Sequence, residues 1–241
     1  MLVEKCKIPI VLFNYKIMSQ RRTINRSQSE NSCPAEAVNE CVKFLVCREG
    51  SKKPIRQADI EKHLTDVLQT PVNKKLVIEN ANKVLKHVYG YKLVQLKGKG
   101  IQYIMVLSDT LPSTCEHLLS TYSEPSHRKL LIAALTHIFM SGGTIKDTDM
   151  WNFLDKTKLL QEHDMEGRKI LTHTFTKQLY LEYNKVGTNE HPRFEFSWGQ
   201  RADEELPKEF ILNKMAQAFD KEPSYWREQF KSTQENGSEL Q

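Results

Sequence analysis

The chain has 241 residues and a net charge of +5, with 39% apolar and 27% charged side chains. This balance is typical of a soluble, globular protein, and the length allows one large domain or two of about 120 residues. The five cysteines are odd in number and form no CxxC pair, which argues against a disulfide framework and a zinc site and favours a reducing, intracellular compartment.

The charge is distributed unevenly along the chain. Residues 1–30 carry 6 basic and 2 acidic side chains, and residues 31–111 carry 13 and 8. Residues 112–199 are nearly neutral at −1, and residues 200–241 carry −3. A basic first half and a mildly acidic second half suggest two domains with different partners.

Residues 1–34 are predicted to form a disordered, basic tail. The apolar run at residues 8–13 is too short to span a bilayer, and no small-residue cleavage site follows it. Polar and basic residues without periodicity occupy residues 19–34. Whether residues 1–17 belong to the working protein stays open.

Residues 35–111 have the pattern of a winged helix. Apolar residues recur at helical spacing over 35–48, 55–68 and 73–89, and Gly90 ends the third and most strongly amphipathic segment. The stretch YKLVQL-KGKG-IQYIMVL follows, with two β-rich runs around a glycine-containing turn. Three helices and a hairpin are the elements of a winged helix, with the hairpin as its wing.

A second copy of this pattern follows a linker at residues 112–124. Helices are predicted within residues 127–143, 144–157 and 168–179, and a hairpin within 177–199 splits at GTNEHP. A further helix lies within 205–223, so the second domain covers residues 125–230, and residues 231–241 are predicted to be a disordered tail. The fold class is therefore mainly α with small β-hairpins (α+β), arranged as tandem winged helices.

The second hairpin, KQLYLEYNKVGTNEHPRFEFSWG, holds five aromatic rings. Phe194, Phe196 and Trp198 share one strand face, which favours packing on a core over stacking on nucleic acid bases. Tyr180 and Tyr183 lie on opposite faces of a regular strand, so one of them is expected to be free for a partner.

No catalytic arrangement stands out. KGKG at residues 97–100 lacks the GxxxxGK[ST] spacing of a phosphate-binding loop, and no serine lies in a GxSxG context. The histidines show neither HExxH nor HxxxH spacing. We therefore expect a binding protein with no enzymatic activity, cofactor or metal.

Lysines on the third helix and the wing make DNA the first binding candidate. A solvated lysine face explains them equally well, and the absence of arginine favours phosphate contact over base readout. The candidate residues are Lys74, Lys75, Lys83, Lys86, Lys97 and Lys99.

The first helix is the candidate protein-binding element. Phe44, Leu45 and Val46 are consecutive, so they cover more than one helical face and at least one of them must project away from the core. Such a side chain is either half-covered or part of a binding ridge.

The sequence resembles the MAGE (melanoma antigen) homology domain family over roughly residues 35–230. The stretches that carry the resemblance are VKFLV, KKPIRQADIEKHL, YGYKLVQL, HIFMSGGTIKDTDMWNFL, RKILTHTFTKQLYLEY and FEFSWGQRA. The sequences of these stretches look most like the branch of the family found in the SMC five/six complex of DNA repair. The resemblance implies tandem winged helices and no enzymatic activity.

The resemblance also implies partners. Family members bind RING-type ubiquitin ligases through a leucine pair that falls on Leu45 and Val46 here, and Phe44 adjoins it. In the SMC branch the second winged helix holds a kleisin, for which Phe175, Leu179 and Tyr183 are the candidate contacts, and the assembly contacts DNA.

The leading hypothesis is a nuclear, non-catalytic subunit of the SMC five/six complex that joins a RING ligase to a kleisin. It would stimulate ubiquitination and help the complex engage DNA. Two alternatives are a free-standing MAGE adaptor of a RING ligase and a winged-helix DNA-binding regulator that acts alone.

Overall fold

The computed structural model describes residues 34–68, 71–98, 100–108, 124–161, 163–187 and 192–238, with the backbone alone for 235–238. Four predictions therefore fall outside the described residues. They concern the tail at residues 1–33, nearly all of the linker (112–123), Lys99, and residues 239–241.

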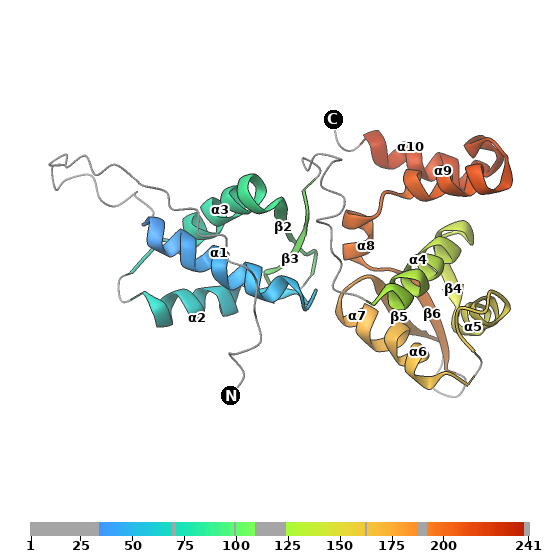
Figure 1. Ribbon diagram of the computed structural model, residues 1–241, viewed down its shortest axis with the longest axis horizontal. Coiled ribbons are helices and arrows are strands. Elements are labelled where there is room, and N and C mark those ends of the chain that lie inside the picture. The colour runs from blue at the N-terminus through green and yellow to red at the C-terminus, as the bar shows by residue number, and fades with distance from the viewer. Residues whose placement is uncertain are drawn as a thin grey trace, which may run out of the picture. The chain divides into compact units, whose positions relative to one another are not determined.

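The first winged helix has the predicted helices and hairpin (Figure 1). Asn73 begins the third helix by accepting a 3.2 Å hydrogen bond from the Leu76 N–H, and Gly90 ends it in the left-handed conformation at φ +69°. Its elements are α1 (Ala35–Glu49), β1 (Ile55–Arg56), α2 (Gln57–Val67), α3 (Lys74–Val84), η1 (Leu85–Tyr89), β2 (Tyr91–Gln95) and β3 (Gln102–Leu107). The sequence patterns miss β1, which pairs with β3 in an antiparallel sheet of order β1-β3-β2.

Each of the helices α1, α2 and α3 buries one apolar stripe against the sheet. The first winged helix therefore has a hydrophobic core of its own. The core contains the apolar residues whose helical spacing in the sequence predicted these helices. Its members include Ala37, Val38, Cys41, Val42, Leu45, Ile60, Leu64, Val77, Ile78, Ala81, Leu85 and Met105.

The second winged helix repeats the order of elements and the topology of the first. Its sheet has the order β4-β6-β5, which matches β1-β3-β2 position by position. The elements are α4 (Pro125–Met140), β4 (Thr144–Lys146), α5 (Asp147–Lys156), α6 (Met165–Lys169), η3 (Ile170–Thr174), α7 (Phe175–Lys177), β5 (Leu181–Val186) and β6 (Arg193–Trp198). The repeat confirms the predicted tandem winged-helix fold.

The aromatic hairpin is fastened to the second core, as its alternation predicts. Phe196 is fully buried, and Tyr183 lies opposite it in the register of β5 and β6. The expectation that Tyr180 or Tyr183 is free was wrong. The Tyr183 ring stacks on Phe194 at 4.9 Å, and Tyr180, just before β5, donates a 2.6 Å hydrogen bond to Glu205 Oε2.

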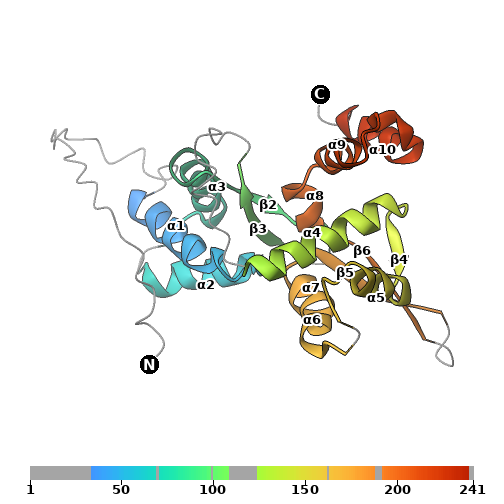
Figure 2. The ribbon, with the colours of Figure 1, turned by 45° about the vertical axis from the view of Figure 1, so that its right-hand side comes forward.

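In the described part of the chain, four further helices follow β6. They are α8 (Gln200–Glu205), α9 (Lys208–Phe219), η4 (Pro223–Tyr225) and α10 (Arg227–Ser238). A small third core forms where Phe139 of α4 meets Ile211 and Leu212 of α9. The views in Figures 1 and 2 agree that α9 and α10 lie side by side.

The prediction of a disordered tail from residue 231 needs correction, because α10 continues to Ser238. The helix is held by the 3.1 Å hydrogen bond from Gln229 Nε2 to the Met140 carbonyl. Ser232 and Thr233 add hydroxyl bonds to carbonyls one turn earlier. Among the helices of the described ranges, none is long and apolar enough to cross a bilayer.

Candidate protein-docking site

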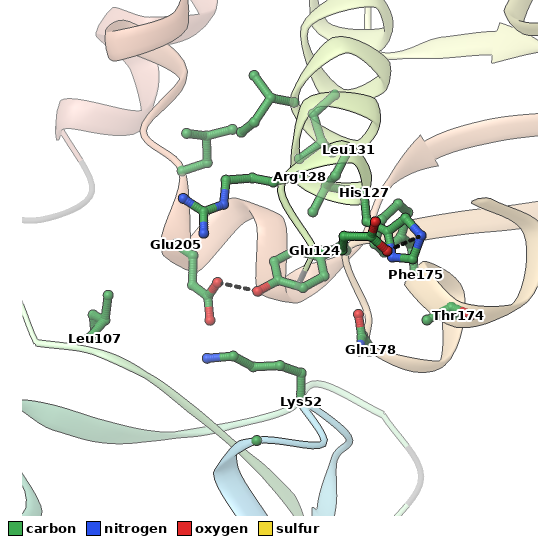
Figure 3. A pocket seen from close by; sticks show the side chains of 15 residues that line it. Lys52, Leu107, Glu124, His127, Arg128, Leu131, Thr174, Phe175, Gln178 and Glu205 are labelled. Atoms are coloured by element: carbon green, nitrogen blue, oxygen red, sulfur yellow. Dashed lines mark hydrogen bonds and ion pairs between the residues drawn. The ribbon is translucent and has the colours of Figure 1, made fainter. Parts of the chain in front are cut away.

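A cavity of about 550 Å³ lies where the first winged helix meets the second (Figure 3). The first domain contributes Lys52, from the turn after α1, and Leu107, at the end of β3. The second domain contributes an apolar floor from α4, α7 and the end of α8, namely Leu131, Ile132, Leu135, Phe175 and Leu206. Apolar walls with a few polar groups at the rim are typical of a site that takes a side chain or a short segment of a partner.

The polar groups at the rim are largely paired with one another. Glu205 accepts hydrogen bonds from the Tyr180 hydroxyl at 2.6 Å and from Arg201 Nη1 at 2.9 Å. Burial and, second, the nearby Glu205 carboxylate raise the pKa of the Tyr180 hydroxyl, so it stays protonated and donates. His127 lies 3.8 Å from Glu124.

Arg201 connects the two winged helices beneath this cavity. Its side chain is 1% exposed, although it is charged. It donates to the carbonyls of Met105 at 2.7 Å and Lys52 at 2.9 Å in the first domain, and to Gln178 at 2.8 Å in the second. Sequence reasoning missed it, because nothing in GQRA distinguishes this arginine from an exposed one. A buried guanidinium with its donors satisfied fixes the geometry of the groups around it.

The residues predicted to bind a kleisin do not come together in one site. Phe175 lines the cavity and belongs to the second core. Leu179 lines a separate cavity of about 250 Å³ beside Lys97 and Gln200, and it adopts a positive φ of 64°. Tyr183 lies in β5 and its hydroxyl is 3.4 Å from Asp147. Of the three, only Phe175 reaches the larger cavity.

The residues predicted to bind a RING ligase divide between core and surface. Leu45 is 0% exposed and belongs to the first core, whereas Phe44 and Val46 pack on its edge and are half-buried. The Phe44 ring stacks on His63 at 4.6 Å and lies 4.2 Å from the Arg48 guanidinium. The part of this motif that a partner can touch is therefore Phe44 and Val46.

The predicted DNA-binding lysines follow one helix and the wing. Lys75, Lys83, Lys86 and Lys97 are exposed and Lys74 is half-buried. The wing is also held by the second domain, because Gln200 bonds the Lys97 backbone N–H at 3.1 Å and carbonyl at 3.0 Å. Within the part of the chain that the structure describes, no three His, Cys, Asp or Glu side chains gather as a metal site would require.

Two winged helices in tandem, joined through Arg201 and sharing a cavity, define a tandem winged-helix protein. The model of the MAGE homology domain matches residues 41–209, and the chain belongs to this family.

Similar proteins include human non-structural maintenance of chromosomes element 3 homolog, 33% identical over 199 residues, which are 80% of this chain and 64% of that protein. The mouse homolog is 32% identical over 80% of this chain and 70% of its own length. Rat melanoma-associated antigen D1 is 31% identical over 81% of this chain and 25% of its own. The chain thus spans less than two thirds of the human relative.

Among solved structures, a chain of the Nse1-Nse3-Nse4 complex is similar with a TM-score of 0.72 and 29% identity. The match covers 83% of this chain and 96% of that chain.

Proposed function

We propose that the chain is a non-catalytic subunit of the SMC five/six complex that joins a RING-type ubiquitin ligase to a kleisin. The observation that carries this proposal is the structural similarity to a chain of the Nse1-Nse3-Nse4 complex. This similarity extends over 96% of that chain. In this role the protein would work in the nucleus, stimulate the ligase and help the complex engage DNA during repair. The similarity to the element 3 homologs supports the same assignment.

The ligase contact is placed on the outer face of α1. Phe44 and Val46 offer apolar surface at the edge of the first core, while Leu45 supports them from within. Apolar side chains on a fixed helix face are well suited to dock a partner, because little conformational entropy is lost on binding. The lysines of α3 and η1 remain candidates for phosphate contact.

The kleisin contact is placed in the cavity between the domains, where Phe175 lies beside Leu131 and Leu135. These side chains can enclose one large apolar side chain of the partner. Leu179 and Tyr183 remain predicted contacts at greater distance from this cavity.

The test is purification of tagged protein from nuclear extract beside a Phe44→Ala/Val46→Ala variant. The variant leaves Leu45 in place, because truncating this buried leucine would destabilise the domain and would not test the surface. Asn39→Ala, an exposed position on the same helix, is the matched control. A cooperative melting transition above the temperature of the purification would show for each of the three proteins that it is folded.

Recovery of a RING protein, a kleisin and SMC subunits, with the RING protein lost only from the double variant, is the expected result. A RING protein without kleisin or SMC subunits would favour the free-standing adaptor. Tight DNA binding without any protein partner would favour the DNA-binding regulator and reject the proposal.

A further inference from the structure

A separate cavity of about 280 Å³ lies within the first winged helix, between α3 and the strands of the wing. Figures 1 and 2 agree that β2 lies beside α3. Helix α3 contributes Lys75, Ile78, Glu79 and Asn82, which follow one another at the spacing of a single helix face. This lining shares no residue with that of the cavity in which the kleisin contact is placed.

The orientation of the polar groups in this cavity is fixed by the protein itself. Asn82 Oδ1 accepts the Leu93 backbone N–H at 2.9 Å, so the Asn82 amide nitrogen must face the other way. The Tyr103 hydroxyl donates to Gln57 Oε1 at 3.2 Å and keeps its own lone pairs as acceptors. Burial of Tyr103 raises the pKa of this hydroxyl, so it remains protonated at neutral pH.

Several of the lining groups are available to a ligand. Among the described residues, no hydrogen-bond partner is found for Asn82 Nδ2, the Gln95 carboxamide or the Glu79 carboxylate. Donors and acceptors therefore line the same cavity. A guanidinium only donates and a phosphate only accepts, whereas the edge of a nucleobase does both. The mixture favours a base as the occupant.

The lysines of α3 supply charge for the phosphates that accompany a base. In the part of the chain that the structure describes, neither Lys75 nor Lys83 has a carboxylate within ion-pair distance. Lys83 donates only to the neutral Asn80, at 3.3 Å. The two lysines are eight residues apart, which is about 12 Å along the helix axis. This row is longer than one phosphate requires and favours a strand over a single nucleotide.

We propose that this cavity binds an adenine base of an unpaired nucleic acid strand, whose phosphates contact Lys75 and Lys83. A glutamine carboxamide such as that of Gln95 pairs with adenine N6 and N7, and Glu79 accepts the second N6 hydrogen. An adenine within a duplex is stacked and paired, so it does not enter the cavity. The inference rests on the DNA contact of the proposed function and deepens it, because it names the strand and the base.

Fluorescence anisotropy with the full chain and labelled oligonucleotides tests this inference. One single strand of about 12 nucleotides contains only thymine, and the other has one adenine at its centre. The strand with the adenine should bind about tenfold more tightly. The same adenine placed in a duplex should give no such gain.

Two pairs of variants separate base recognition from phosphate contact. Gln95→Leu changes an exposed residue and should bind the two single strands equally, whereas Gln161→Leu, an exposed glutamine outside the cavity, should keep the preference. Lys75→Gln should weaken binding of both strands and reduce its salt dependence. Lys62→Gln, an exposed lysine on α2, should do neither.

Equal affinity of the wild-type protein for the two strands would overturn the inference, as would a preference that persists in Gln95→Leu. Adenosine monophosphate serves as the competitor. Competition only at concentrations far above those of the strand would support a strand as the ligand, whereas equal potency would assign the same cavity to a free nucleotide. Failure of these tests leaves the ligase and kleisin contacts standing, because the purification from nuclear extract measures them independently.

Discussion

Leu45 and Val46 are neighbours in the chain but have different structural roles. Leu45 is fully buried in the first core, and Val46 is half-buried at its edge. Leu45→Ala should therefore lower the free energy of unfolding by about 2–5 kcal/mol through the cavity it leaves. Val46→Ala should lower it by clearly less, which urea denaturation of both variants would measure. Equal losses would contradict the division into core and surface.

Tyr183 links stability to alkaline pH. Burial and, second, the Asp147 carboxylate raise its pKa to about 12, from about 10 in an unfolded chain. The folded state thus prefers the protonated phenol, and the resulting stabilisation is present below pH about 10 and lost as the pH rises toward 12.

The prediction is a difference between two unfolding curves. Between pH about 9 and about 12, the wild-type free energy of unfolding should fall more steeply than that of Tyr183→Phe. Tyr225→Phe, which changes an exposed tyrosine, provides the control. Parallel curves for wild type and Tyr183→Phe would show that folding does not raise the pKa of the Tyr183 hydroxyl.

At the scale of elements, the turn between α7 and β5 fits against the start of α8 without room for another carbon. A Cβ on Gly199 would lie 2.6 Å from the carbonyl carbon of Leu179, and this neighbour is backbone and cannot rotate away. Gly199→Ala should cost about 3 kcal/mol of stability. Gly142→Ala should lower the stability by only about 1 kcal/mol. A Cβ there meets no atom within 4 Å, so the only cost is that of the positive φ.

Thermal and urea unfolding of the two variants would measure this difference. A Gly199→Ala protein as stable as Gly142→Ala would mean that the turn relaxes easily. The Leu179 carbonyl also accepts the Arg201 backbone N–H at 2.9 Å, so a displaced turn should disturb the connection between the domains as well.

Most helices and both hairpins could be predicted from the sequence, because their apolar residues repeat at the period of the element that buries them. The strands β1 and β4 could not, since runs of two and three residues carry no measurable period. The predicted helix at residues 168–179 begins earlier, at Met165, where Asp164 caps it. Caps of this kind are local signals and could have improved the boundary.

The candidate site was less predictable than the fold. The cavity combines Lys52, Leu107, Phe175 and Glu205, which are far apart in the chain and share no motif. Phe175 was a predicted kleisin contact, chosen for its place at the end of the third helix of the second domain. Arg201 could not be identified from the sequence, because the partners of a buried charge depend on tertiary contacts that periodicity does not encode.

At the scale of the molecule, Arg201 should make the two winged helices unfold together. Each domain has its own core, and Arg201 bonds carbonyls on both sides. Arg201→Met would leave these carbonyls unsatisfied, at a loss of about 3–5 kcal/mol. One cooperative transition is expected for wild type and two for the variant.

Differential scanning calorimetry would distinguish these cases. Lys208→Met, which removes a partly exposed lysine from its ion pair with Asp203, should keep one transition. A single, barely shifted transition for Arg201→Met would show that other contacts couple the domains.

The third core has a practical consequence for expressing fragments of this protein. The family match ends at residue 209, within the first turn of α9. A fragment cut there would lose Ile211 and Leu212, which cover Phe139, and would leave an apolar surface in water. Such a fragment should aggregate at concentrations where a longer one, extended through α10, stays monodisperse.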